Sequence, residues 1–106
     1  MNPRETDRRR RILLSLQGAL LGEVPPALRG VTVGWDERSI RIIAYFDGEI
    51  SEEDRESMAC VETEVIADFP EGEEIRLDSV RRDAPAAMET LNEWVYLRRE
   101  PLLLSS

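Results

Sequence analysis

The segment DGEISEED, residues 47–54, holds the residue types that could bind a metal ion. Asp47, Gly48 and Asp54 fit the fifth, sixth and twelfth places of a calcium-binding loop. The first and third places of such a loop normally carry carboxylates, because calcium takes about six to eight oxygen ligands. Here those places hold Ile43 and Tyr45, which supply no carboxylate. We therefore expect no metal site in this segment.

The same segment has the features of a turn that leads into a helix. Asp47-Gly48 can reverse the chain, because glycine accepts a positive φ without a steric clash. Ser51 is a natural N-cap, and Asp54 follows it at the spacing of a capping box. The two glutamates between them would lie in the first turn, where the helix dipole favours anions. The segment thus predicts a helix that starts at Ser51.

Groups suited to acid–base or nucleophilic chemistry are scarce in this sequence. It has no histidine, and so it lacks the usual general base and the commonest metal ligand of proteins. The single cysteine, Cys60, excludes an internal disulfide, argues against a zinc site and fits a reducing compartment. Nothing marks two carboxylates as buried together, as acid–base catalysis would require. We expect a protein that is not an enzyme and uses no cofactor and no metal.

The distribution of charge points to a protein partner. The formal net charge is −8, which argues against binding nucleic acid. Residues 47–74 hold twelve acidic residues against Arg55 alone, a net charge of −11, which leaves about +3 for the rest of the chain. Such a surface either forms a solvated face that keeps the protein soluble or steers a basic partner into contact. We expect the arginines of residues 8–11 to act within the chain, facing its acidic helix.

The first helix is predicted over residues 5–22, with Thr6 or Asp7 as its cap. Apolar residues recur at helical spacing and should face the core; they are Ile12, Leu16, Ala19 and Leu20, with Leu13 beside them. Leu14 and Leu21 fall on the opposite side, where they could form a contact surface. No apolar stretch is long enough to span a membrane, and the N-terminus lacks the pattern of a secretory signal. These features predict a cytoplasmic protein.

Strands are predicted on both sides of the acidic helix. VTVGWD (31–36) and SIRIIAYF (39–46) alternate with period two and should form an antiparallel hairpin around DERS. IRLDSV (75–80) predicts a third strand. WVYLRR (94–99) predicts a final edge strand, with a terminal helix as the alternative. Trp94 and Tyr96 in this last segment are candidate interface aromatics, since large aromatic side chains dominate interface energetics.

The acidic helix, Ser51 to about Phe69, determines the predicted architecture. Its apolar arc comprises Met58, Val61, Val65, Ile66 and Phe69, and it needs a sheet beneath it. Glu62 falls inside this arc and should pair with an arginine such as Arg41 or one of the first helix; alternatively it marks a polar notch in a binding surface. We expect a single α+β domain over residues 1–106. It would be a two-layer sandwich, in the order α-β-β-α-β-(β), with two helices on one face of an antiparallel sheet of three to four strands.

Four stretches together resemble one family of small bacterial proteins. They are ALLGEVPPALRGVTVGWDERSIRI, YFDGEISEEDRE, ETEVIADFP and EWVYLRRE, and they cover the chain from about Ala19 to Glu100. The family is grouped with the immunity proteins of contact-dependent growth inhibition, or polymorphic toxin, systems. The resemblance implies a protein that neutralises the toxin domain of a sister gene. Many such toxins are nucleases with basic active sites, which an acidic surface could fill.

The sequence therefore supports two hypotheses of different classes. The first is a cytoplasmic, non-catalytic immunity-type protein that binds a cognate protein toxin, with no nucleic acid and no membrane involved. Its candidate contacts lie on the acidic helix and are Glu52, Glu53, Glu56 and Glu64. The second is a self-associating structural or scaffold protein. It would form a homodimer through Leu14, Leu21 and the segment WVYLRR.

Overall fold

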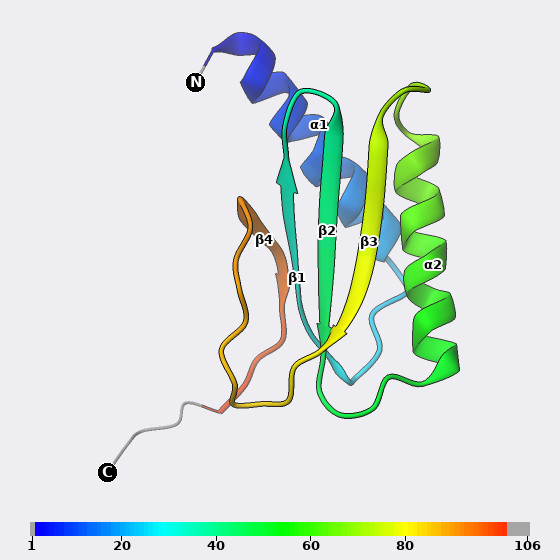
Figure 1. The fold of residues 1–106 in the computed structure, drawn as a ribbon, viewed down its shortest axis with the longest axis vertical. Helices are drawn as coiled ribbons and strands as arrows, with labels where there is room; N and C mark the ends of the chain where they lie inside the picture. Colours follow the sequence, from blue (N-terminus) through cyan, green and yellow to red (C-terminus); the bar gives the residue numbers. More distant parts are fainter. Residues whose placement is uncertain (1, 102–106) are drawn as a thin grey trace.

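The structure, a computed structural model, describes residues 2–101 and shows an α+β fold (Figure 1). Both helices lie on one face of a four-stranded sheet, as the sequence predicts. The ends of the described chain lie on the side of the sheet away from α2 (Figure 1). In chain order the elements are α1 (Pro3–Leu20), β1 (Leu28–Trp35), β2 (Ser39–Phe46), α2 (Glu52–Ala67), β3 (Glu74–Arg81) and β4 (Glu93–Leu97).

Helix α1 begins earlier than predicted. Its N-cap is Asn2, whose side chain accepts a hydrogen bond from the backbone N–H of Glu5 at 2.9 Å. Pro3 then occupies the first turn, where its missing N–H costs nothing. The prediction of Thr6 or Asp7 as the cap is therefore corrected. The helix ends at Leu20, and Gly22 follows with φ of 79°.

Strands β1 and β2 form the predicted antiparallel hairpin. Val31 lies opposite Ala44 and Val33 opposite Ile42, and all four belong to the core that the helices cover. The carboxylate of Asp36 closes the turn by accepting hydrogen bonds from the backbone N–H groups of Arg38 and Ser39, each at 2.9 Å. Because the alternation and the turn chemistry agree, the sequence was sufficient to predict this hairpin.

The sheet has the order β3-β2-β1-β4, and its strands are not all antiparallel. β3 runs parallel to β2, with Ile40 opposite Ile75 and Ile42 opposite Leu77. This corrects the expectation of an entirely antiparallel sheet. The reason is the connection: α2 carries the chain back along the sheet between the two strands, and such a crossover returns the next strand in the same direction.

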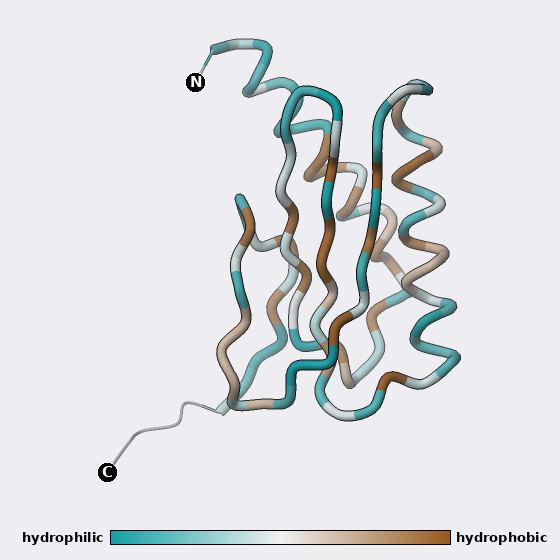
Figure 2. The backbone as a smooth tube through the Cα atoms, in the orientation of Figure 1, coloured by the Kyte–Doolittle hydropathy of each residue, from teal (hydrophilic) through white to brown (hydrophobic). Residues whose placement is uncertain are grey.

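Helix α2 begins as predicted. The Ser51 hydroxyl accepts a hydrogen bond from the Asp54 N–H at 3.1 Å, and Gly48 has φ of 82° in the preceding turn. Met58, Val61 and Val65 are buried, together with the apolar residues of α1. Figure 2 shows the first turns of α2 as hydrophilic, whereas hydrophobic residues recur along β2. One member of the predicted arc, Ile66, is instead 48% exposed.

The final segment is a strand, so the predicted edge strand is confirmed and the alternative of a terminal helix is wrong. β4 pairs antiparallel with β1, and Tyr96 opposite Val31 packs against the core. The connection between β3 and β4 contains no helix and packs on the other face of the sheet. There Tyr45 donates its hydroxyl hydrogen bond to the carbonyl of Glu89 at 3.0 Å. Thr32 accepts a hydrogen bond from the Leu91 N–H at 2.9 Å. This packing explains why Tyr45 and Thr32 are buried although they point away from the helices.

A network of charged side chains ties the C-terminal segment to the sheet. Arg29, only 2% exposed, donates hydrogen bonds to both carboxylate oxygens of Glu100, at 2.7 and 2.9 Å. It also bonds the carbonyls of Arg82 and Ala86. Arg98 bridges Glu100 at 2.9 Å and a carboxylate of the β2–α2 turn at 3.0 Å. Four separate segments of the chain are joined here.

Candidate functional site

The four glutamates singled out on the acidic helix all lie exposed on α2. Glu52, Glu53, Glu56 and Glu64 occupy the side of the helix opposite its buried residues. At 1.5 Å per residue the set spans about 18 Å along the helix axis. Within residues 2–101, none of these carboxylates lies within salt-bridge distance of an arginine. Their charge is therefore not compensated by the described chain.

The basic segment of α1 pairs with other carboxylates. Arg8 binds the carboxylate of Glu73 and the carbonyl of Asp36, the latter at 2.8 Å. Arg9 binds both carboxylate oxygens of Glu93, at 2.5 and 2.6 Å. These arginines act within the chain, but their partners stand on β4 and in the loop before β3. Arg8 and Arg9 therefore do not pair with the acidic helix as expected, whereas the Arg11 guanidinium lies 5.4 Å from the centroid of the Phe69 ring, at the end of the predicted helix. The carboxylates of α2 are not neutralised by Arg8 or Arg9.

Asp47 has a structural role rather than a metal-binding one. Its carboxylate accepts hydrogen bonds from the Arg98 side chain at 3.0 Å and from the Ala84 N–H at 3.1 Å. These bonds hold its pKa below the usual value, the Arg98 bond having the larger effect. The neighbouring Gly48 N–H is bound by Asp83 at 2.7 Å. Among residues 2–101 no cluster of three or more acidic, cysteine or histidine side chains could hold a metal ion.

Glu62 has a partner that the sequence did not suggest. Its carboxylate accepts a hydrogen bond from the backbone N–H of Leu77, at 2.7 Å. The expected ion pair with Arg41 is not formed; that side chain lies 4.0 Å from Asp78 instead. Glu62 therefore binds the edge of the sheet, because the wheel position that puts it in the apolar arc also points it at β3. Its apparent misplacement in the sequence was the signal for this contact.

A groove of about 310 Å³ lies where α2 meets β3. Its walls come from both elements: Arg55, Met58, Ala59 and Glu62 from α2, and Leu77, Asp78 and Ser79 from β3. The exposed Ile66 stands one helical turn beyond Glu62, on the same side of α2. The groove thus combines apolar surface, a carboxylate and the outer edge of the sheet. Periodicity alone could not reveal it, because it depends on which strand lies beside α2.

The two candidate aromatics take part in packing. Trp94 lies 6.3 Å from Tyr45, measured between ring centroids, and a Cβ added at Gly30 would stand 2.9 Å from the Trp94 ring. Tyr96 packs against the hydrophobic core. Both side chains are half-buried. They lie on opposite faces of the sheet and do not form one surface with the four glutamates.

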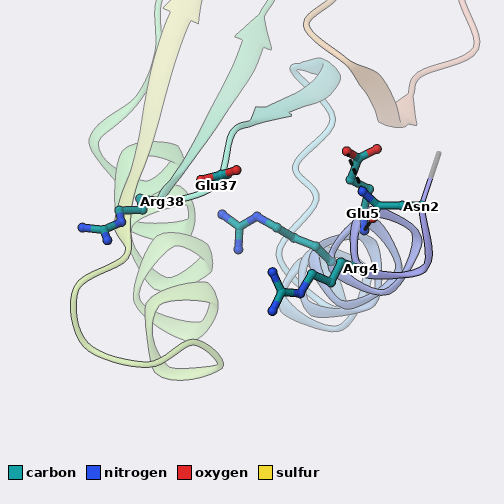
Figure 3. Close-up of a pocket in the computed structure, with 6 residues that line it drawn as sticks. Asn2, Arg4, Glu5, Glu37 and Arg38 are labelled. Atoms are coloured by element: carbon teal, nitrogen blue, oxygen red, sulfur yellow. Dashed lines mark hydrogen bonds between the residues drawn. The ribbon is translucent and has the colours of Figure 1, made fainter.

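A second hollow, of about 430 Å³, lies between the start of α1 and the β1–β2 turn (Figure 3). Its lining mixes charges of both signs: Arg4, Glu5 and Arg8 come from the helix, and Glu37 and Arg38 from the turn. Glu5 is engaged by Asn2 at the start of the helix (Figure 3). Arg4 and Arg38 are exposed and lie apart in this view. The two carboxylates of the lining, Glu5 and Glu37, also lie apart in Figure 3.

The described part of the chain presents an unpaired acidic helix, a groove beside it and a sheet edge, and neither of its helices is long and apolar enough to cross a membrane. A family model described as "MafI2 immunity protein" matches residues 9–100. No curated protein matches the chain.

Proposed function

The chain belongs to the MafI2 immunity protein family, and we propose that it binds and neutralises a cognate bacterial toxin domain through the acidic face of α2. The contacts would be Glu52, Glu53, Glu56 and Glu64. We place the encounter in the cytoplasm, as expected of an immunity protein in a polymorphic toxin system. In this proposal the protein acts by binding alone and needs no cofactor.

The unpaired charge of α2 is the observation that carries the proposal. Eight ion pairs of the described residues engage arginines elsewhere, while the four glutamates stay exposed and without a cation. Uncompensated carboxylates repel one another along a helix, and this repulsion costs the free protein stability. A basic partner would remove that cost and would be drawn to the surface from a distance.

The expected mode of inhibition is occupation of a basic site. A nuclease active site holds phosphate with cationic side chains, and a row of carboxylates offers comparable charge on a rigid support. Such contact would block substrate access without any covalent change in the toxin. The α2 scaffold suits this role, because its capped start and its buried face fix the carboxylates in place.

Charge reversal tests the proposal. The chain should be co-expressed with the C-terminal domain of the toxin protein encoded by the neighbouring gene, and growth should be measured. Changing Glu52, Glu53, Glu56 and Glu64 to arginine should abolish rescue and complex formation, because attraction becomes repulsion. The melting temperature of the variant should show that it still folds.

A matched control reverses four other exposed acidic residues, namely Glu5, Asp7, Glu37 and Glu89. This set changes the net charge equally and also includes one first-turn position, Glu5 of α1. The control should still rescue growth. Rescue that survives reversal on α2 would move the interface elsewhere, whatever the control does.

Self-association is the second candidate. Leu14 is 62% exposed and Leu21 77%, two turns apart on the outer side of α1, and Leu97 on β4 is 54% exposed. Burying such side chains is favourable by about 1.5–3 kcal/mol each, which favours a homodimer through these elements. Sedimentation velocity distinguishes the two candidates, since a dimer that persists on dilution supports self-association. The two functions are compatible.

A further inference from the structure

We propose that the outer edge of β3 accepts an extended segment of the toxin as a fifth strand, lying in the groove beside α2 and carrying basic side chains. This inference rests on the proposed function and specifies how the partner is held. It makes the backbone of β3 the binding element, whereas the acidic face of α2 attracts and orients the segment.

The hydrogen bonds of β3 show which of its backbone groups are directed outward. The N–H of Glu74 donates to the carbonyl of Arg38, and the N–H of Arg82 donates to the carbonyl of Phe46. The backbone N–H and C=O groups of the even-numbered residues are therefore directed toward β2. In a parallel strand each residue directs its N–H and C=O to the same side, and successive residues alternate. The odd-numbered residues Ile75, Leu77 and Ser79 therefore direct theirs away from the sheet.

The carboxylate of Glu62 already binds one of these outward-directed N–H groups. Its carboxylate accepts the Leu77 N–H at 2.7 Å, as a carbonyl of a neighbouring strand would. Side chains that cover an exposed edge in this way prevent unwanted pairing. The contact is also exchangeable, because an incoming strand can supply a carbonyl to the same N–H while Glu62 turns to a cationic side chain of the partner.

The other edge of the sheet is less suited to pairing. β4 has five residues, and its register against β1 shifts between Val31 and Thr32, whereas β3 has eight residues in unbroken register with β2. Bulged and short edge strands resist further pairing. β3 thus offers the longer and straighter template.

The groove determines the chemistry of the segment. Ala59 and Leu77 line it, and Ile66 is exposed beside it, so the side chains of the segment that face these residues should be apolar. α2 carries six carboxylates against Arg55 alone, a net charge of −5, so the remaining side chains should be basic.

Amide hydrogen exchange tests the inference with the complete chain and the neighbouring gene's toxin domain. In the free protein the N–H groups of Ile75 and Ser79 should exchange faster than those of Arg76 and Asp78. In the complex the exchange of Ile75 and Ser79 should slow by about tenfold or more, since local opening then requires the added strand to leave. A complex in which these two amides exchange as before would overturn the inference and leave the proposed function standing.

A pair of variants at Ser79 gives an independent measurement. Ser79→Pro removes an outward N–H without touching the bonds to β2, and proline is tolerated at such edge positions. Ser79→Ala keeps the N–H and should bind the toxin domain about tenfold more tightly than Ser79→Pro, as expected for one backbone hydrogen bond and its steric match. Equal affinities would contradict strand addition.

The remaining outcomes are also decisive. Failure of the wild-type chain to bind the toxin domain would overturn the proposed function, and this inference with it. Slow exchange of Ile75 and Ser79 in the free protein at high concentration, together with a dimer in sedimentation, would assign the edge to a second copy of this chain and overturn the toxin-strand inference. Exchange measured on the wild-type chain needs no variant to fold.

Discussion

Glu100 shows how a single carboxylate can hold the end of the described chain in place. Hydrogen bonds from Arg29, and secondarily from Arg98, lower its pKa from 4.5 to about 2, although partial burial opposes the shift. A carboxyl group whose pKa is lower in the folded state stabilises that state above its unfolded pKa. This stabilisation is lost as the pH falls through the folded value.

Glu100→Gln should therefore destabilise the protein in a pH-dependent way. At pH 7 we expect a loss of about 1–3 kcal/mol in the free energy of unfolding, because Arg29 and Arg98 would both lose the charge of this carboxylate. The difference from wild type should shrink as the pH falls from about 4.5 to about 2. Urea denaturation at several pH values measures it. Glu37→Gln, at an exposed position, is the control, and an equal pH dependence there would contradict the assignment.

For single residues, the sequence predicted local interactions better than contacts between distant segments of the chain. The Ser51 cap and the turn at Gly48 were predictable because both interactions are local. The bond from Leu77 to Glu62 and the burial of Arg29 depend on segments that meet only in the folded chain. A helical wheel shows that Glu62 falls among the apolar residues of α2 and not on its solvent-exposed side. It does not show which group the side chain contacts.

At the scale of elements, periodicity predicted both helices and all four strands. It could not assign the direction of β3, because alternation is the same in parallel and antiparallel strands. It also could not show that the β3–β4 connection packs on the sheet. Residues 82–92 have no strong pattern of their own, and their placement depends on small residues in β1 that let Trp94 and Leu91 approach.

Gly30→Ala tests this close approach. A Cβ at Gly30 would stand 2.9 Å from the Trp94 ring and 3.1 Å from Leu97, so we expect a loss of about 1–3 kcal/mol in the free energy of unfolding. Gly18→Ala on α1 meets nothing within 4 Å and should instead stabilise by about 0.5–1 kcal/mol, as alanine favours the helix. Thermal melting compares the two. Similar behaviour at both positions would show that the packing on β1 is loose.

At the scale of the whole molecule, charge is separated by element. Residues 47–74 carry a net charge of −11, and the rest of the chain is close to +3. Arg8 and Arg9 of α1 are used in internal ion pairs, while the four exposed glutamates of α2 take part in none of the ion pairs of residues 2–101. Because of this separation, a basic partner is attracted mainly to the side of the molecule that carries α2. The sequence indicated the asymmetry, and six of the twelve acidic residues of this segment lie on α2.

The association rate should therefore depend on salt. Raising the ionic strength from about 0.05 to about 0.5 M should lower the association rate constant with the toxin domain about tenfold, because screening shortens the reach of the acidic face. Stopped-flow fluorescence can measure the rate. A variant with glutamine at the four α2 positions should bind more slowly and respond less to salt. If both proteins respond equally, long-range steering by α2 is excluded.

The placement of the chain ends has a practical consequence for such measurements. Both ends of the described chain lie on the β4 side, away from α2 and β3 (Figure 1). An affinity tag or fluorescent label attached at either end would leave that edge clear. Protein immobilised through either terminus should therefore expose the same edge of the sheet to the solution. Binding curves measured with the two immobilised forms should agree.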